Sequence, residues 1–130
     1  MLNEGELDPI LERNGFVKLA LEDLSVAEQI STFRAAEVIV SPHGAGLTNV
    51  IFCRPGTRIL EIFPKGGLHS SAFMRLASLC GLGYGYLCGE TVANAFSGKN
   101  SNNADIVCAP AEFEQALFTA LSGPQSAAHD

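Results

Sequence analysis

The residues best suited to chemistry form one short run, Ser41–Asn49, which reads S-P-H-G-A-G-L-T-N. This run follows a β-branched segment and precedes an apolar one, so a turn from a strand into a helix is predicted. The free backbone N–H groups at a helix start attract anions through hydrogen bonds and the helix dipole. Glycines leave the backbone open to a ligand, and His43 can add hydrogen bonds of its own. The run therefore predicts a phosphate-binding turn.

A second interpretation of the same run stays open. Gly44 and Gly46 can simply permit a tight strand-to-helix turn, with His43 bonded to a local partner. The spacing is not that of a Walker A loop, because G-x-x-x-x-G-K-[ST] is absent. It also differs from the dinucleotide fingerprint G-x-G-x-x-G, since Asn49 stands where the third glycine belongs.

Helical and strand patterns alternate along the chain. Strands are expected at Phe16–Ala20, Glu37–Ser41, Arg58–Phe63, Gly83–Cys88 and Ile106–Cys108. Helices are expected at Glu4–Asn14, Ser25–Ala36, Leu47–Cys53, from Ser70 or Ser71 to Cys80, and at Ala111–Leu121. This alternation predicts an α/β fold, a Rossmann-like parallel sheet with helices on both faces. Ser41–Asn49 then lies beyond the carboxyl end of a strand, where such sheets bind ligands.

The expected organisation is a single domain over residues 1–121. The polar segment Gly89–Asp105 is expected to be a surface loop, and residues 122–130 have the composition of a disordered tail. At 130 residues, the chain is long enough to bury one hydrophobic core.

Composition excludes several classes of function. A net charge of −6 with scattered basic residues argues against a nucleic-acid partner. No apolar run is long enough for a membrane span and no signal peptide is visible, so a cytoplasmic location is expected. The four cysteines lack the spacing of metal ligands and are expected to be buried free thiols. The adjacent acids Glu22 and Asp23 lack a companion D-x-D motif, so no metal site is predicted.

Several motifs together resemble glycosyltransferase family 61. The matching pieces are N-E-G-E-L (Asn3–Leu7), G-F (Gly15–Phe16), L-S-V-A-E-Q-I (Leu24–Ile30), A-A-E-V-I-V (Ala35–Val40), H-G-A-G-L-T-N (His43–Asn49) and P-G-T-R-I-L-E-I-F-P (Pro55–Pro64). The resemblance implies the C-terminal, donor-binding half of a GT-B type enzyme, which works without a bound metal. That family includes enzymes of capsular polysaccharide biosynthesis.

The resemblance also implies a set of substrate-binding residues. The residues implied to hold the diphosphate of a nucleotide-sugar donor are His43, Gly44, Ala45, Gly46, Leu47, Thr48 and Asn49. Glu61 would contact a ribose or brace the turn, and the helix opening at Leu24–Gln29 would lie near the base. Lys65 and His69 are further candidates for the same cleft, or else solvated loop residues.

The implied function is transfer of a sugar from a UDP-sugar-like donor to a glycan acceptor. The acceptor-binding domain of the family has no counterpart in this sequence, so no catalytic residue is assigned and the isolated chain is expected to be inactive. The alternative is a nucleotide-binding or self-associating domain without catalysis. The opening central strand of the donor domain also has no counterpart, which predicts either a homodimer or a sheet rearranged around Phe16–Ala20.

Overall fold

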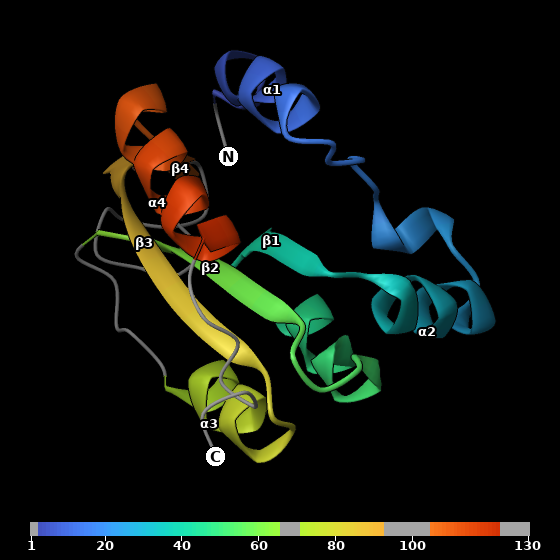
Figure 1. Cartoon of the computed structure of the whole chain (residues 1–130). Coiled ribbons are helices and arrows are strands. Elements are labelled where there is room, and N and C mark those ends of the chain that lie inside the picture. Colours follow the sequence, from blue (N-terminus) through green and yellow to red (C-terminus); the bar gives the residue numbers. More distant parts are fainter. Residues whose placement is uncertain (1–2, 66–70, 93–104, 123–130) are drawn as a thin grey trace.

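The computed structural model describes residues 3–65, 71–92 and 105–122. Within them, four strands form one sheet in the order β1-β2-β3-β4 (Figure 1). The strands are β1 (Val38–Pro42), β2 (Arg58–Pro64), β3 (Gly83–Val92) and β4 (Asp105–Val107). β1 and β3 both run parallel to β2, whereas β4 runs antiparallel to β3.

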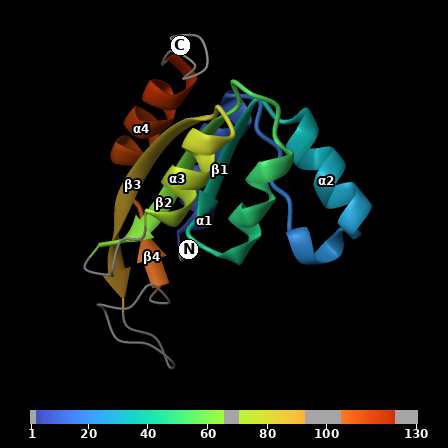
Figure 2. The ribbon, with the colours of Figure 1, turned by 90° about the horizontal axis from the view of Figure 1, so that it is seen from below.

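Helices cover both faces of this sheet (Figure 2). The α-helices are α1 (Glu4–Arg13), α2 (Val26–Ala35), α3 (Ala72–Leu79) and α4 (Pro110–Ser122), and the 3-10 helices are η1 (Leu21–Asp23) and η2 (Ala45–Phe52). η2 lies in the connection from β1 to β2, and α3 lies in the connection from β2 to β3. Both connections lead to the next strand on the same side, so two right-handed crossovers place them on the same face of the sheet. α1 and α4 pack on the other face.

The central strand β2 divides the hydrophobic core in two. Leu60 and Ile62 point toward α1 and α4, where they meet Phe113 among other side chains. Ile59 points the other way, toward Leu47 of η2 and the helices α2 and α3. Both faces of β2 are covered by helices. After Arg58, its residues are accordingly apolar except for a single buried acid. That acid belongs to the candidate site.

The α/β architecture with helices on both faces is confirmed, but the prediction of an all-parallel sheet is wrong. β3 runs on to Val92, into the segment expected to be a loop, and its far end pairs with β4 in the antiparallel sense. The sheet is therefore mixed. The rest of that expected loop, residues 93–104, lies outside the described residues, as do residues 123–130 of the expected tail; Ser122 ends α4.

The prediction of a strand at Phe16–Ala20 is also wrong. This segment is extended, but it forms no ladder with any strand in the described part of the chain. A strand needs a hydrogen-bonded neighbour, and without one the side chains of Val17 and Leu19 stay 78% and 51% exposed. β1 is consequently the edge of the sheet on this side.

The starts of α1 and α2 are capped differently. The Ser25 side chain accepts from the Glu28 N–H at the start of α2, and the Glu28 carboxylate accepts from the Ser25 N–H, which completes a capping box. Asn3 does not cap α1 with its side chain, because its amide bonds to the backbone of Cys108 instead.

None of the four cysteines forms a disulfide, as expected. Cys53 and Cys108 are buried, whereas Cys80 and Cys88 are only half-buried. Burial raises the pKa of Cys53 to about 11, so this thiol is protonated and unreactive near neutral pH. Among the described helices, none combines the length and apolar character that a membrane crossing requires.

Candidate functional site

The predicted turn lies where β1 ends beside the end of β2. The His43 N–H donates to the carbonyl of Ile62 at 2.8 Å, which extends the β1–β2 ladder by one residue. The first hydrogen bond of η2 runs from the Leu47 N–H to the Gly44 carbonyl at 3.1 Å. The N–H group of Gly46 precedes that bond and has no backbone partner within the described residues. A strand-to-helix turn with an open backbone donor is therefore present.

His43 is held by a buried carboxylate. Its Nδ1 lies 2.5 Å from Oε2 of Glu61, a β2 residue whose side chain is 0% exposed. The imidazole ring stacks on Phe63, with ring centroids 5.0 Å apart, and meets Phe73 at 5.4 Å. The histidine side chain itself stays 20% exposed, and its Nε2 has no hydrogen-bond partner within the described residues.

The second carboxylate oxygen of Glu61 is also occupied. The hydroxyl of Tyr84, on β3, donates to Oε1 at 2.5 Å. Burial, reinforced by the hydrogen bond to Glu61, raises the pKa of this tyrosine, so the hydroxyl remains a proton donor at neutral pH. Two adjacent strands and the turn after β1 thus supply a continuous chain of hydrogen bonds from Tyr84 through Glu61 to His43.

The two glycines of the turn serve different purposes, and neither adopts a left-handed backbone conformation. A Cβ on Gly46 would lie 2.8 Å from Cδ1 of Leu21, so the absence of a side chain lets η1 pack closely against η2. A Cβ on Gly44 would meet nothing nearer than the Pro42 carbonyl at 4.0 Å. Gly46 therefore has a packing role, whereas Gly44 leaves open space beside His43.

The remaining residues of the run point in different directions. Leu47 is 2% exposed and belongs to the core, while Thr48 lies on the surface of η2. The Asn49 amide donates to Oε1 of Gln29 at 3.1 Å, and the Gln29 amide donates in turn to the carbonyls of Leu21 and Leu24. Asn49 thus ties η2 to α2 and η1. The structure brings His43 and Glu61 together and leaves Thr48 apart from them.

Sequence reasoning missed Tyr84, Phe63 and Phe73 as components of the site. One pattern points to Tyr84: it alternates with Tyr86 on β3, so both tyrosines face the same side of the sheet. Which acid it reaches depends on the strand register, in which Glu61 lies opposite Tyr86, two residues along β3 from Tyr84. That register cannot be deduced from one sequence.

The two other candidates named from the sequence have different outcomes. The ammonium group of Lys65 lies 3.0 Å from Glu90, in an exposed ion pair beyond the end of β2. His69 lies outside the described residues. No group of three His, Cys, Asp or Glu side chains placed to hold a metal ion is found in the part of the chain that the structure describes.

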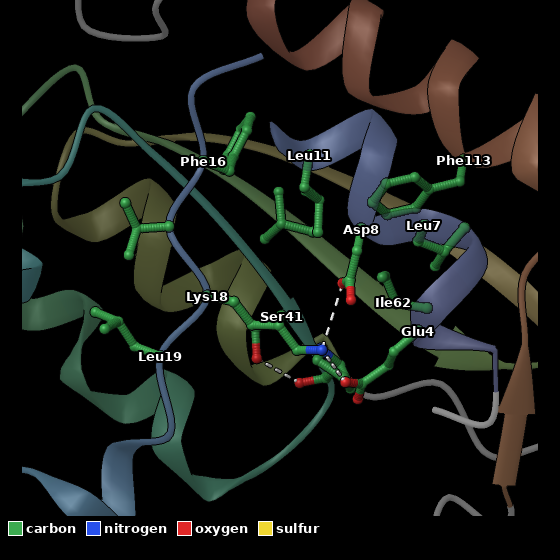
Figure 3. Close-up of a pocket in the computed structure, with 13 residues that line it drawn as sticks. Glu4, Leu7, Asp8, Leu11, Phe16, Lys18, Leu19, Ser41, Ile62 and Phe113 are labelled. Carbon is green, nitrogen blue, oxygen red and sulfur yellow. Dashed lines mark hydrogen bonds and ion pairs between the residues drawn. The ribbon is translucent and has the colours of Figure 1, made fainter. Parts of the chain in front are cut away.

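Two hollows border the turn on the side of α1. A pocket of about 230 Å³ lies between α1, the extended segment and β1, with an apolar floor and a Lys18 amine directed at Glu4 and Asp8 (Figure 3). A wide, open hollow of about 740 Å³ reaches Gly46 itself. Its charged lining residues are one base and three acids: Lys18, Glu4, Glu22 and Asp23.

Comparison with known proteins identifies a family whose matched region includes this turn. Residues 1–60 match the family model described as Glycosyltransferase 61. The chain is therefore a glycosyltransferase family 61-like protein, and His43–Asn49 lie inside the matched region.

Individual relatives are glycosyltransferases by name. Alpha-1,3-arabinosyltransferase XAT3 of Oryza sativa subsp. japonica is 33% identical over 90 residues, which are 64% of this chain and 16% of that protein. Protein O-linked-mannose beta-1,4-N-acetylglucosaminyltransferase 2 of Tetraodon nigroviridis is 36% identical over 67 residues, 49% of this chain and 12% of that protein. The Canis lupus familiaris protein of the same name is 32% identical over 92 residues, 67% of this chain and 16% of that protein. The chain thus spans less than a fifth of each of these relatives.

Proposed function

We propose that the turn after β1 binds the diphosphate of a nucleotide-sugar donor, a UDP-sugar or a close analogue, as the donor-binding part of a glycosyltransferase. The observation that carries this proposal is the position of His43. Its Nδ1 is engaged by Glu61, and its Nε2 is unengaged within the described residues, in the same short turn as the open N–H group of Gly46. A backbone donor and an imidazole in one turn, with no side chain at Gly44 between them, suit a phosphate oxygen.

Charge supports placing the diphosphate at His43 rather than in the neighbouring hollow. The hollow beside Gly46 is lined by three acids against one lysine, and that lysine is already paired with Glu4 and Asp8. A phosphate there would be repelled. The hollow suits the neutral parts of a nucleotide better, because carboxylates such as Glu22 and Asp23 can accept hydrogen bonds from ribose hydroxyls.

The similarity to family 61 supports a proposal for the wider enzyme. We place this chain as a Rossmann-like donor domain of the GT-B type, acting without a metal, with the glycan acceptor bound by another part of the enzyme. The named relatives transfer a pentose in one case and an N-acetylhexosamine in the other. Loops and the acceptor-binding part set such specificity, so the donor is proposed by class alone.

Calorimetric titration of the purified chain with UDP, UMP and uridine tests the binding proposal. UDP is expected to bind with a Kd below about 1 mM, which corresponds to a binding free energy more favourable than about −4 kcal/mol. UMP is expected to bind more weakly than UDP, and uridine is expected to bind most weakly. This order of affinities is expected because each phosphate group adds contacts with His43 and the turn. Equal affinity for UDP and uridine, or no UDP binding at millimolar concentration, would refute a diphosphate site.

Incubation with UDP-sugars separates an enzyme from a binding module. Release of UDP from one of them, by hydrolysis or by transfer to an added glycan, supports a catalytically competent site. UDP binding with no release supports the alternative of a nucleotide-binding domain that needs an acceptor-binding part for catalysis.

Self-association is a second candidate function, favoured by the open edge of the sheet. β1 has no partner on one side within the described residues, and Val17 of the neighbouring extended segment is 78% exposed. Pockets of about 230 and 210 Å³ flank that segment, so it packs loosely against β1. We propose that a second copy of the chain covers this edge.

Light scattering after size exclusion measures this association. The chain is expected to elute as a dimer, and Val17→Lys, which places a charge on the exposed segment, is expected to shift it to a monomer. Leu79→Lys is the matched control, because Leu79 is 85% exposed on α3, away from this edge. A wild-type chain that is monomeric at all concentrations contradicts the dimer.

A further inference from the structure

We propose that Glu61 and Tyr84 are positioning residues that fix the His43 ring so that Nε2 is the nitrogen presented to the donor diphosphate. This inference rests on the proposed donor site, but it makes a claim about the unliganded protein that can be tested separately. The sequence left two roles open for Glu61, contact with a ribose or bracing of the turn. The present proposal assigns the second role to Glu61.

The burial of Glu61 carries the first step. Its side chain is 0% exposed and both carboxylate oxygens are already engaged, one by His43 and one by Tyr84, each at 2.5 Å. A carboxylate enclosed in this way has no oxygen left to reach a ligand. Its effect on a ligand must therefore pass through the histidine.

The direction of the hydrogen bonds carries the second step. The Tyr84 hydroxyl is the donor toward Oε1, because its raised pKa keeps the proton on the tyrosine. A carboxylate oxygen accepts, so His43 Nδ1 must carry the proton that it shares with Oε2. The hydrogen bond at one ring nitrogen sets the state of the other. Nε2 is thus the acceptor of the neutral ring, and an added proton turns it into a donor toward a phosphate oxygen.

The aromatic contacts carry the third step, because they fix the plane of the ring. His43 stacks on Phe63 with an interplanar angle of 24° and meets Phe73 at 58°. One hydrogen bond and two ring contacts leave the imidazole little freedom to flip. The strength of a hydrogen bond depends on its length to within a few tenths of an ångström. An imidazole ring that is already held in place therefore binds a phosphate oxygen without a further loss of conformational entropy.

The tautomer of His43 can be measured directly. The chain has three histidines, so His69→Gln combined with His129→Gln leaves His43 as the only imidazole. Nitrogen-15 NMR of this variant at alkaline pH is expected to show a protonated Nδ1 and an unprotonated Nε2 in the absence of any ligand. In the same background, Glu61→Leu removes the acceptor at similar volume and is expected to abolish the preference for the Nδ1–H form.

Tyr84→Phe tests the role of Tyr84, the residue of the hydrogen-bond chain that does not contact His43. The substitution leaves the Glu61 carboxylate in place. It is expected to speed exchange of the Nδ1 proton with water and to weaken UDP binding about threefold to tenfold, as loss of one hydrogen bond does. Tyr86→Phe is the matched control: the same atom is removed from the same strand, but both oxygens of Glu61 are bonded to other residues. This control is expected to match the parent chain in both measurements.

The outcomes separate the two proposals. A protonated Nε2 and bare Nδ1 in the free chain, or a Tyr84→Phe variant indistinguishable from Tyr86→Phe, would overturn the positioning role. The expected tautomer, in a chain whose His43 resonances do not move when UDP is added, supports the positioning role and refutes the donor site.

Discussion

Replacement of Glu61 by alanine is expected to lower the free energy of unfolding by about 2 to 4 kcal/mol. The substitution removes the acceptor for both His43 and Tyr84 and leaves a cavity at a fully buried position on the central strand. Relief of burying a carboxylate offsets part of this loss. Urea denaturation followed by circular dichroism measures the change, which is a large fraction of the stability of a small domain.

The matched control is Glu90→Ala on the neighbouring strand. Glu90 forms an exposed ion pair with Lys65, in which the side chains are 73% and 66% exposed. Such pairs contribute between 0 and about 1 kcal/mol, so this variant is expected to unfold close to the parent. If Glu61→Ala were as stable as Glu90→Ala, the hydrogen-bond chain from Tyr84 to His43 would have no part in holding the site together.

The largest effect on binding is expected at His43. His43→Ala is expected to weaken UDP binding by about 10-fold to 100-fold, the equivalent of one hydrogen bond to a charged group. Because this change also leaves the buried Glu61 carboxylate short of a partner, His43→Gln is measured beside it. The glutamine amide can still donate to Glu61, but it has no second nitrogen to present to a phosphate.

Both His43 variants are therefore expected to lose UDP affinity, while His43→Gln retains more stability. Lys65→Ala serves as the control for a general loss of positive charge, because Lys65 is exposed and paired with Glu90. It is expected to change UDP affinity less than threefold at physiological salt. An effect at Lys65 larger than the effect at His43 would move the phosphate site to the end of β2.

Much of the fold could be predicted because its local signals are strong. The β-branched run Glu37–Ser41 corresponds to β1, and the Ser25–Glu28 capping box marks the start of α2 where expected. His43 follows β1 directly, so its place at the turn needed only the order of one strand and one helix. Such features depend on neighbours in sequence, which a single chain reveals.

Features that depend on distant neighbours could not be predicted. Phe16–Ala20 has the composition of a strand, but composition does not supply the pairing partner that a strand needs. The role of Gly46 depends on Leu21, which is brought beside it only by the packing of η1 against η2. Tyr84 is 23 residues from Glu61, and the strand register decides that their side chains meet.

The most direct test of the proposed donor site is a crystal structure of the chain with bound UDP. The diphosphate is expected at the turn, with one phosphate oxygen within about 3 Å of His43 Nε2 and another facing the N–H group of Gly46. The Nδ1–Glu61 contact is expected to persist. UDP bound in the pocket beside α1, or at any place that leaves His43 Nε2 without a phosphate contact, would contradict the proposed site.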